Sequence, residues 1–178
     1  MKISFNWLKD YTATSLAPAK LAEKLTMAGL EVEKITSIDG DTIFEIEVTP
    51  NRPDCLNMMG IARELSAILN KNYRLPKIPK ISSVKQKCPI TIEDKKGCLR
   101  YIGAVVENVH VGQTPEWIKK RIQSLDLRSI NSVVDITNFC LMELGQPLHA
   151  FDYDKLFGRK IVVRRARLWF RSRTHCYA

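Results

Sequence analysis

The stretch from residue 129 to residue 152 constrains the fold more than any other part of the chain. It is an apolar run of helical character that carries two adjacent small polar residues, Thr137 and Asn138. A Gly-Gln-Pro sequence then stops the helix and turns the chain back, because proline cannot continue a helix. The turn delivers His149 among apolar neighbours. A hydroxyl, an amide and an imidazole in apolar surroundings have the composition of a small polar pocket.

Thr137, Asn138 and His149 also have an ordinary structural interpretation. A threonine in a helix often bonds to its own preceding turn, and an asparagine can cap a helix. A single histidine beside a phenylalanine is usually a core residue with its hydrogen bonds satisfied. Composition alone favours this structural interpretation over a pocket.

Four stretches of the chain carry a resemblance that favours the pocket instead: residues 129–152, Met1–Leu30, Glu47–Leu56 and Arg128-Ser129-Ile130. They resemble the bacterial phenylalanyl-tRNA synthetase beta subunit. In the editing domain of that family, the Thr-Asn pair and the histidine of a Pro-Leu/Met-His-Ala-Phe-Asp turn line the pocket that hydrolyses misacylated tyrosyl-tRNA. The similarity extends over roughly residues 1–167 in the family's order, which argues against chance.

The resemblance implies a function and a set of partners. The chain is expected to be an N-terminal part of a phenylalanine–tRNA ligase beta subunit that works with an alpha subunit and tRNA(Phe). Thr137, Asn138 and His149 are the expected editing-pocket residues. ATP and magnesium are implied for the full enzyme, but this chain has no Gly-rich phosphate loop, and we assign it no aminoacylation, cofactor or metal residues. The family's acidic residue that reads the tyrosine hydroxyl lies in a later segment, so the expected pocket is incomplete.

Two other functions stay open at this stage. The first is a non-catalytic module that binds RNA or an amino acid, and it would need its charge on a folded face. The second is a free-standing trans-editing aminoacyl-tRNA deacylase, and it would need a complete pocket.

Bulk properties favour a small cytoplasmic protein. The 178 residues suffice for one ordinary domain or two small ones, and 45% of them are hydrophobic. No apolar run approaches the ~20 residues that cross a bilayer, so we expect no membrane contact. The five cysteines are odd in number and none has Cys-x-x-Cys spacing. Reduced thiols are therefore favoured over a disulfide framework or a zinc site.

The net charge of +9 is concentrated in two segments. Residues 71–87 hold six basic residues, residues 159–178 hold seven, and neither segment holds an acidic residue. All 19 acidic residues lie elsewhere, so the rest of the chain is slightly acidic. The basic character thus belongs to a linker and a tail, where solvated charge is commoner than a binding site.

The patterns predict an α+β fold in two units. Residues 1–70 form a packing module, 71–87 a basic linker, 88–167 a partial B3/B4-like editing domain, and 168–178 a tail that does not match the family. The tail looks truncated or frame-shifted, and His175 and Cys176 receive no role.

The first unit is expected to contain a helix and a β-hairpin. Asp39-Gly40 suits a two-residue turn because both residues accept positive φ. Most family members carry an inserted OB-type tRNA-binding domain near this hairpin, as the resemblance implies, and this chain lacks it. Arg52 is expected to pair with Asp54, which could also cap the next helix. The predicted elements are strands Lys2–Trp7, Glu31–Ile38 and Thr42–Val48, and helices Ser15–Gly29 and Met58–Leu69.

The second unit is expected to be mixed. It should contain strands at Ile90–Glu93, Arg100–Asn108 and Ile161–Val163, and a short turn at Asp152–Leu156. A helix should begin at Thr114-Pro115 with an apolar side that includes Trp117, Ile118, Ile122 and Leu125.

Overall fold

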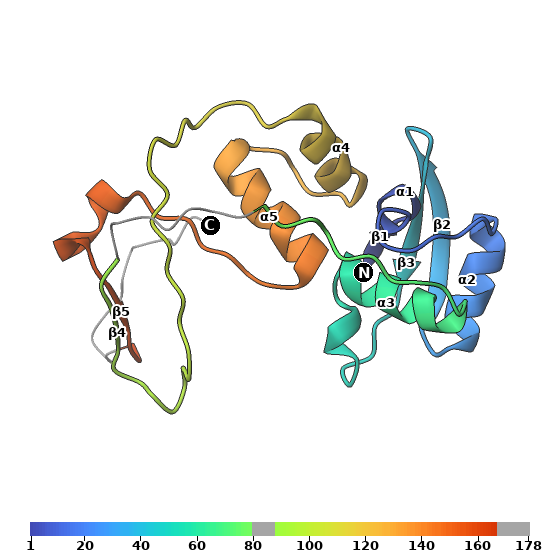
Figure 1. Ribbon diagram of the computed structural model, residues 1–178, viewed down its shortest axis with the longest axis horizontal. Helices are drawn as coiled ribbons and strands as arrows, with labels where there is room; N and C mark the ends of the chain where they lie inside the picture. Colours follow the sequence, from blue (N-terminus) through green and yellow to red (C-terminus); the bar gives the residue numbers. More distant parts are fainter. Residues whose placement is uncertain (80–87, 167–178) are drawn as a thin grey trace. The chain divides into compact units, whose positions relative to one another are not determined.

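The computed structural model describes residues 1–79 and 88–166 (Figure 1). The predicted tail and residues 80–87 of the linker lie outside the described residues. Two compact units are present, Met1–Ile78 with Val111–Leu148 and Pro79–His110 with His149–Ala178. The first unit contains α-helices and strands, and the described part of the second contains two strands and two 3₁₀ turns. This mixture of helices and strands confirms the predicted α+β class. The predicted domain boundaries stay a prediction.

The predicted hairpin forms the sheet of the first unit. β2 (Val32–Ile38) and β3 (Asp41–Ile46) pair antiparallel, and β1 (Lys2–Ser4) adds to the other side of β3. Asp39 and Gly40 have φ of 48° and 77°, as a two-residue turn with positive φ at both positions requires. The chain passes directly from β2 to β3 with no domain inserted between them.

The first strand is shorter than predicted. The alternation over Lys2–Trp7 predicts one strand, but β1 ends at Ser4 and the short helix α1 (Phe5–Leu8) follows. Ser4 is the reason, because its Oγ accepts a hydrogen bond from the Trp7 backbone N–H at 3.0 Å and so caps the helix.

The next helix, α2 (Pro18–Met27), ends two residues before the predicted boundary at Gly29. Gly29 adopts a φ of 90°, and the Leu30 N–H bonds back to the Leu25 carbonyl at 2.9 Å. This is the left-handed termination that glycine favours at the end of a helix.

The helix α3 (Met58–Ile68) is capped by a different residue from the one predicted. A 3₁₀ turn, Pro53–Cys55, intervenes and carries Asp54 away from the helix terminus. Asn57 caps α3 instead, and its Oδ1 accepts from the Gly60 N–H at 2.7 Å. The predicted capping role of Asp54 is therefore wrong.

Two further helices complete the first unit. They are α4 (Glu116–Ser124) and α5 (Ser132–Leu144), which contact each other, and α5 also contacts α3. Asn131 caps α5 by accepting hydrogen bonds from two backbone N–H groups. Gly145 ends α5 with a φ of 72°, and its N–H bonds to the Leu141 carbonyl at 2.8 Å. The predicted break after α5 is confirmed.

The core of the first unit joins both of its sequence segments. Large apolar side chains from the N-terminal segment pack with side chains from α4 and α5. The fully or nearly buried members include Trp7, Leu21, Leu25, Phe44, Ile61, Leu65, Ile118, Ile122 and Phe139. Of the predicted apolar side of α4, Trp117 is the exception, because 56% of its surface is exposed.

The second unit has less regular structure than predicted. β4 (Ile90–Ile92) and β5 (Ile161–Val163) form a parallel pair, and two 3₁₀ turns, Tyr153–Lys155 and Phe157–Arg159, precede β5. The strand predicted at Arg100–Asn108 is wrong. A strand needs a neighbour to receive its backbone hydrogen bonds, and within the described residues none pairs with this segment.

None of the helices in residues 1–79 and 88–166 has the length and hydropathy needed to cross a membrane.

Candidate functional site

Thr137 and Asn138 lie on α5, and both side chains are partly buried. The Thr137 hydroxyl donates a hydrogen bond to the Val134 carbonyl at 2.7 Å, which is the contact expected from the structural interpretation. The Asn138 amide has no hydrogen-bond partner within the part of the chain that the structure describes. Its donors and its acceptor are therefore available to a ligand, whereas the Thr137 hydroxyl retains only acceptor capacity.

His149 follows the turn at Gly145 and is exposed, as are its neighbours Leu148 and Phe151. It belongs to the second unit, whereas Thr137 and Asn138 belong to the first. The pocket shared by the three side chains stays a prediction.

Asp135 anchors the start of α5 and was not singled out from the sequence. Its buried carboxylate accepts hydrogen bonds from the Thr114 hydroxyl, from the Ser129 hydroxyl at 2.5 Å and from the Ile130 N–H at 2.9 Å. Burial raises the pKa of this carboxyl, but the hydrogen bonds from Ser129, Thr114 and backbone amides outweigh it, so the net pKa lies below its usual value. An aspartate within the run Val-Val-Asp-Ile was the available sequence signal.

Asp135 acts through α5 on the candidate site. It lies two and three residues before Thr137 and Asn138, and its hydrogen bonds tie the first turn of α5 to the loop before the helix and to Thr114. It also places a negative charge at the positive end of the helix dipole. The carboxylate thus fixes the position from which α5 presents both polar side chains.

Residues near the N-terminus contact α5 further along the helix. The Trp7 ring stacks on Phe139 with centroids 4.7 Å apart and an interplanar angle of 19°. The Tyr11 hydroxyl donates to Glu143 and accepts from the Trp7 indole N–H at 3.2 Å. Burial and the hydrogen bond to Glu143 raise the pKa of the Tyr11 phenol above its usual range.

Two carboxylates and a thiol lie close together around Arg52. The ligand atoms of Asp54, Cys55 and Glu64 lie within 4.8 Å of one another, the spacing of a metal site. The Arg52 guanidinium already neutralises them, with Nε 3.1 Å from Asp54 and an NH2 group 2.8 Å from Glu64. The predicted Arg52–Asp54 pair is confirmed. The hydrogen bond from Arg52 lowers the pKa of Asp54 to about 2, and burial raises the pKa of the Cys55 thiol to about 11. The group is therefore interpreted as a structural ion-pair network.

Known proteins match most of the chain. Residues 97–169 match the family model of the B3/4 domain, which contains Thr137, Asn138 and His149. The phenylalanine–tRNA ligase beta subunit of Rhodopirellula baltica is 39% identical over 167 residues, which are 92% of this chain and 24% of that protein. The beta subunit of Fusobacterium nucleatum is 49% identical over 130 residues, 71% of this chain and 16% of that protein.

A third beta subunit, from Carboxydothermus hydrogenoformans, is 43% identical over 141 residues, 78% of this chain and 17% of that protein. The chain thus spans about a quarter or less of the length of these curated relatives. These matches confirm the resemblance carried by the sequence motifs. The chain is a relative of the phenylalanine–tRNA ligase beta subunits and corresponds to part of their length.

Proposed function

We propose that the chain serves as part of a phenylalanine–tRNA ligase beta subunit, and that Thr137, Asn138 and His149 contribute to a pocket that hydrolyses tyrosine wrongly attached to tRNA(Phe). One observation carries the proposal. Within the B3/4-matched residues, the side-chain amide of Asn138 is partly buried and has no partner in the described chain. It lies about two helix turns before the Gly145 reversal that leads to His149. An alpha subunit and tRNA(Phe) are the implied partners.

The three side chains suit ester hydrolysis without a protein nucleophile. An aminoacyl ester is already activated, so the reaction needs a positioned water and a polarised carbonyl. The imidazole of His149 can hold a water and relay its proton, because one ring nitrogen can accept a hydrogen bond while the other donates one. The Asn138 amide can donate to the ester carbonyl, and the Thr137 hydroxyl can accept a hydrogen bond from the substrate because its own proton goes to Val134.

Selection of tyrosine over phenylalanine would depend on one hydroxyl. A pocket built to bond that hydroxyl leaves buried polar groups unpaired when phenylalanine enters, and such sites reach large discrimination ratios. None of the three side chains is an acidic group that would read the hydroxyl. We propose that a segment outside the matched residues supplies it, as the family resemblance implies, and that ATP and magnesium are bound by other parts of the enzyme.

A substrate analogue tests the pocket directly. The isotope-labelled chain is titrated with 3′-tyrosylamino-3′-deoxyadenosine, an amide that cannot hydrolyse, and amide and imidazole shifts are followed by NMR. We expect shifts at Thr137, Asn138 and His149, and loss of these shifts in Asn138→Ala and His149→Ala. His110→Ala is the matched control, because His110 is exposed in the same unit as His149. Shifts that persist in both pocket variants would refute the assignment.

Activity assays separate this proposal from its alternatives. The purified chain is expected neither to charge tRNA(Phe) with phenylalanine and ATP nor to deacylate tyrosyl-tRNA above the spontaneous rate. Fast deacylation that His149→Ala abolishes would favour a free-standing deacylase. ATP-dependent charging would overturn the assignment of aminoacylation to other parts of the enzyme.

A further inference from the structure

We propose that the first unit carries a binding groove for single-stranded RNA, in which Trp117 stacks on a base and Arg74 and Lys77 contact phosphates. The groove is a hollow of about 420 Å³ that these residues line together with Arg121 and Phe139. We call it the Trp117 groove. The inference rests on the proposed function in one respect, since tRNA is the substrate there, but it assigns residues other than those of the editing pocket.

The aromatic wall of the groove is rigid. Trp117 packs edge-to-face against Phe139, with ring centroids 5.3 Å apart and an interplanar angle of 84°. Phe139 is buried and is itself stacked on Trp7. The Arg121 guanidinium lies 5.6 Å from the Trp117 centroid and 5.2 Å from the Trp7 centroid. A half-exposed indole fixed by buried rings and accompanied by a guanidinium is a platform on which a base can stack.

The charges of the groove leave two cations available. Of the two acidic side chains that line it, Asp10 pairs with Arg121 at 2.5 Å, whereas Glu143 accepts the Tyr11 hydroxyl, a hydrogen bond that does not cancel its charge. With three cations and two carboxylates, the lining has a net charge of +1. Arg74 and Lys77 are exposed, and their side chains have no partner in the described part of the chain.

The backbone at Arg74 is anchored, because its N–H donates to the Tyr11 carbonyl at 2.7 Å. The groove therefore holds two cations near an aromatic platform before any ligand arrives, and an anionic ligand complements them.

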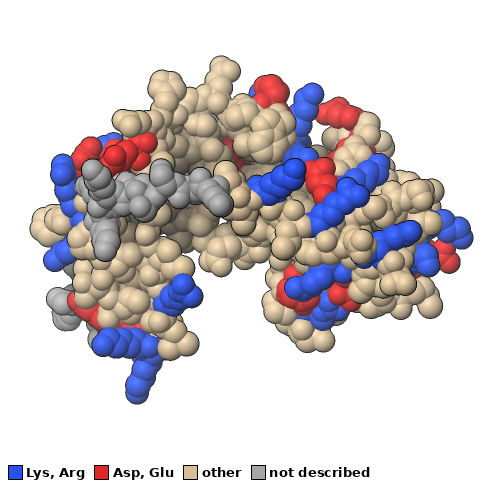
Figure 2. All heavy atoms as spheres, viewed as in Figure 1, with Lys and Arg blue, Asp and Glu red and all other residues tan. Residues whose placement is uncertain are grey.

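The neighbouring sequence favours RNA over an acidic peptide. Arg74 and Lys77 belong to the segment 71–87, which has six basic and no acidic residues and so suits a chain of repeating phosphates. On the face that Figure 2 shows, Lys and Arg side chains are interspersed with Asp and Glu. An acidic peptide would use the cations but has no need of an exposed indole, whereas single-stranded RNA uses both.

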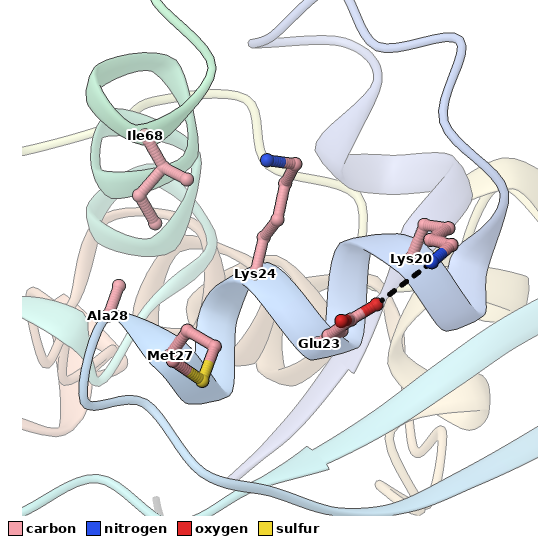
Figure 3. A pocket seen from close by; sticks show the side chains of 6 residues that line it. All are labelled: Lys20, Glu23, Lys24, Met27, Ala28 and Ile68. Carbon is pink, nitrogen blue, oxygen red and sulfur yellow. Dashed lines mark hydrogen bonds and ion pairs between the residues drawn. The ribbon is translucent and has the colours of Figure 1, made fainter.

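A second hollow in the same unit provides a matched control. It has a volume of about 460 Å³ and is lined by α2 side chains and Ile68 of α3 (Figure 3). Lys20 and Lys24 supply two cations there, but Lys20 pairs with Glu23 at 3.2 Å and no aromatic ring lines the hollow. Removing these two lysines changes the net charge as much as removing Arg74 and Lys77 does.

Fluorescence anisotropy of a short labelled oligoadenylate with the purified chain tests the groove. Arg74→Gln/Lys77→Gln should weaken binding at least ~10-fold and lower the slope of log affinity against log salt by about 1.4, the value for two single-strand phosphate contacts. Trp117→Leu should weaken binding about 10-fold through lost stacking and leave the salt slope unchanged. Lys20→Gln/Lys24→Gln should change affinity less than ~2-fold, well short of one lost phosphate contact. Circular dichroism confirms that each variant is folded.

Three results would overturn the proposal. The first is that both double variants weaken RNA binding equally. The second is that polyglutamate displaces the RNA as effectively as unlabelled RNA does. The third is that the chain does not bind RNA at low salt. The first would show diffuse charge attraction, and the second an acidic-peptide site. The editing proposal is tested separately, because the tyrosyl analogue reports on Thr137, Asn138 and His149 and has no phosphate for Arg74 and Lys77.

Discussion

Replacing Asp135 should destabilise the first unit more than any other single change to a carboxylate on α4 or α5. The side chain is buried and accepts hydrogen bonds from two hydroxyls and one backbone N–H. In Asp135→Ala all three donors lose their acceptor. An unsatisfied buried donor costs about 1–3 kcal/mol, but Ser129 and Ile130 are not buried and can recover bonds to water. Thr114 therefore contributes about 1–3 kcal/mol, and the bonds from Ser129 and Ile130 contribute about 0.5–1.5 kcal/mol each. The expected loss is about 2–6 kcal/mol of unfolding free energy, a large share of a typical total of about 5–15 kcal/mol.

Asp135→Asn should cost less than Asp135→Ala. The amide oxygen can still accept from Ile130, and the two hydroxyls can rotate to accept from the amide NH₂ group. Hydrogen bonds to a charged group contribute about 1.5–3 kcal/mol each to stability, and neutral ones contribute about 0.5–1.5 kcal/mol each. The variant loses the difference between these contributions. Relief of the charge burial offsets part of this difference, which leaves an expected loss of about 1–3 kcal/mol.

The pH dependence gives the prediction a second readout. The folded-state pKa of Asp135 is lowered, so its contribution to stability is fully present above the unfolded-state pKa, about 4, and is lost as the pH falls through the folded value. The stability gap between the natural chain and Asp135→Asn should therefore be constant from pH 5 to pH 7 and close below pH 4. Urea unfolding followed by circular dichroism at several pH values measures it.

A matched carboxylate supplies the control. Glu116 on α4 is 73% exposed and lies 3.5 Å from Lys119, so Glu116→Gln should change stability by less than about 0.5 kcal/mol. If Asp135→Ala costs no more than Glu116→Gln, the carboxylate does not anchor α5 and the argument from its hydrogen bonds is wrong.

Three further predictions concern other residues of the first unit and one thiol of the second. Gly40→Ala should cost about 1 kcal/mol in urea unfolding, since an added Cβ meets no atom within 4 Å and only the φ of 77° opposes it; Gly40→Asn should cost less, and an equal cost would contradict this reasoning. Arg52→Gln should raise the pKa of Asp54 from about 2 toward its usual value of about 4, as ¹³C NMR of the carboxyl would show, whereas a value that stays near 2 would assign the shift to other donors. Iodoacetamide should label Cys88 in the folded chain and reach Cys55 only on unfolding, because Cys55 is buried and its pKa is raised to about 11; labelling at equal rates would refute this.

The features that the sequence predicted well are those decided by a few adjacent residues. Asp39 and Gly40 adopt the positive φ expected of them, and Gly145 ends α5 where the Gly-Gln-Pro sequence predicted a stop, since each of these features depends on local sterics rather than on distant contacts. The apolar spacing of α3 and α5 likewise predicted helices that the structure contains.

The features that the sequence did not predict depend on partners far along the chain. The apolar run Arg100–Asn108 has the composition of a strand, but composition does not supply a neighbouring strand. The Tyr11–Glu143 bond joins residues 132 positions apart, and no spacing rule points to it. The capping of α1 by Ser4 is local but competes with an equally local alternation, and one side-chain hydrogen bond decides the outcome.

The residues of the candidate site also fall into those that the sequence indicated and those that it did not. Thr137, Asn138 and His149 stood out through the family resemblance, while residue patterns alone favoured a structural interpretation. The Thr137–Val134 bond agrees with that interpretation for one residue, and the unpartnered Asn138 amide does not. Asp135 escaped notice because its importance comes from Thr114, which is 21 positions earlier in the sequence.

The helix α5 both holds the fold of the first unit together and carries two residues of the proposed site, Thr137 and Asn138. Asp135, Phe139 and Glu143 are four residues apart and so lie on one stripe, which faces Thr114, Trp7 and Tyr11. Thr137 is two residues after Asp135 and two residues before Phe139, so it lies about half a turn around the helix from this stripe. Loss of a stripe residue should therefore weaken both the fold and the site. Loss of the Thr137 hydroxyl removes only a bond to its own helix, so it should affect the site alone.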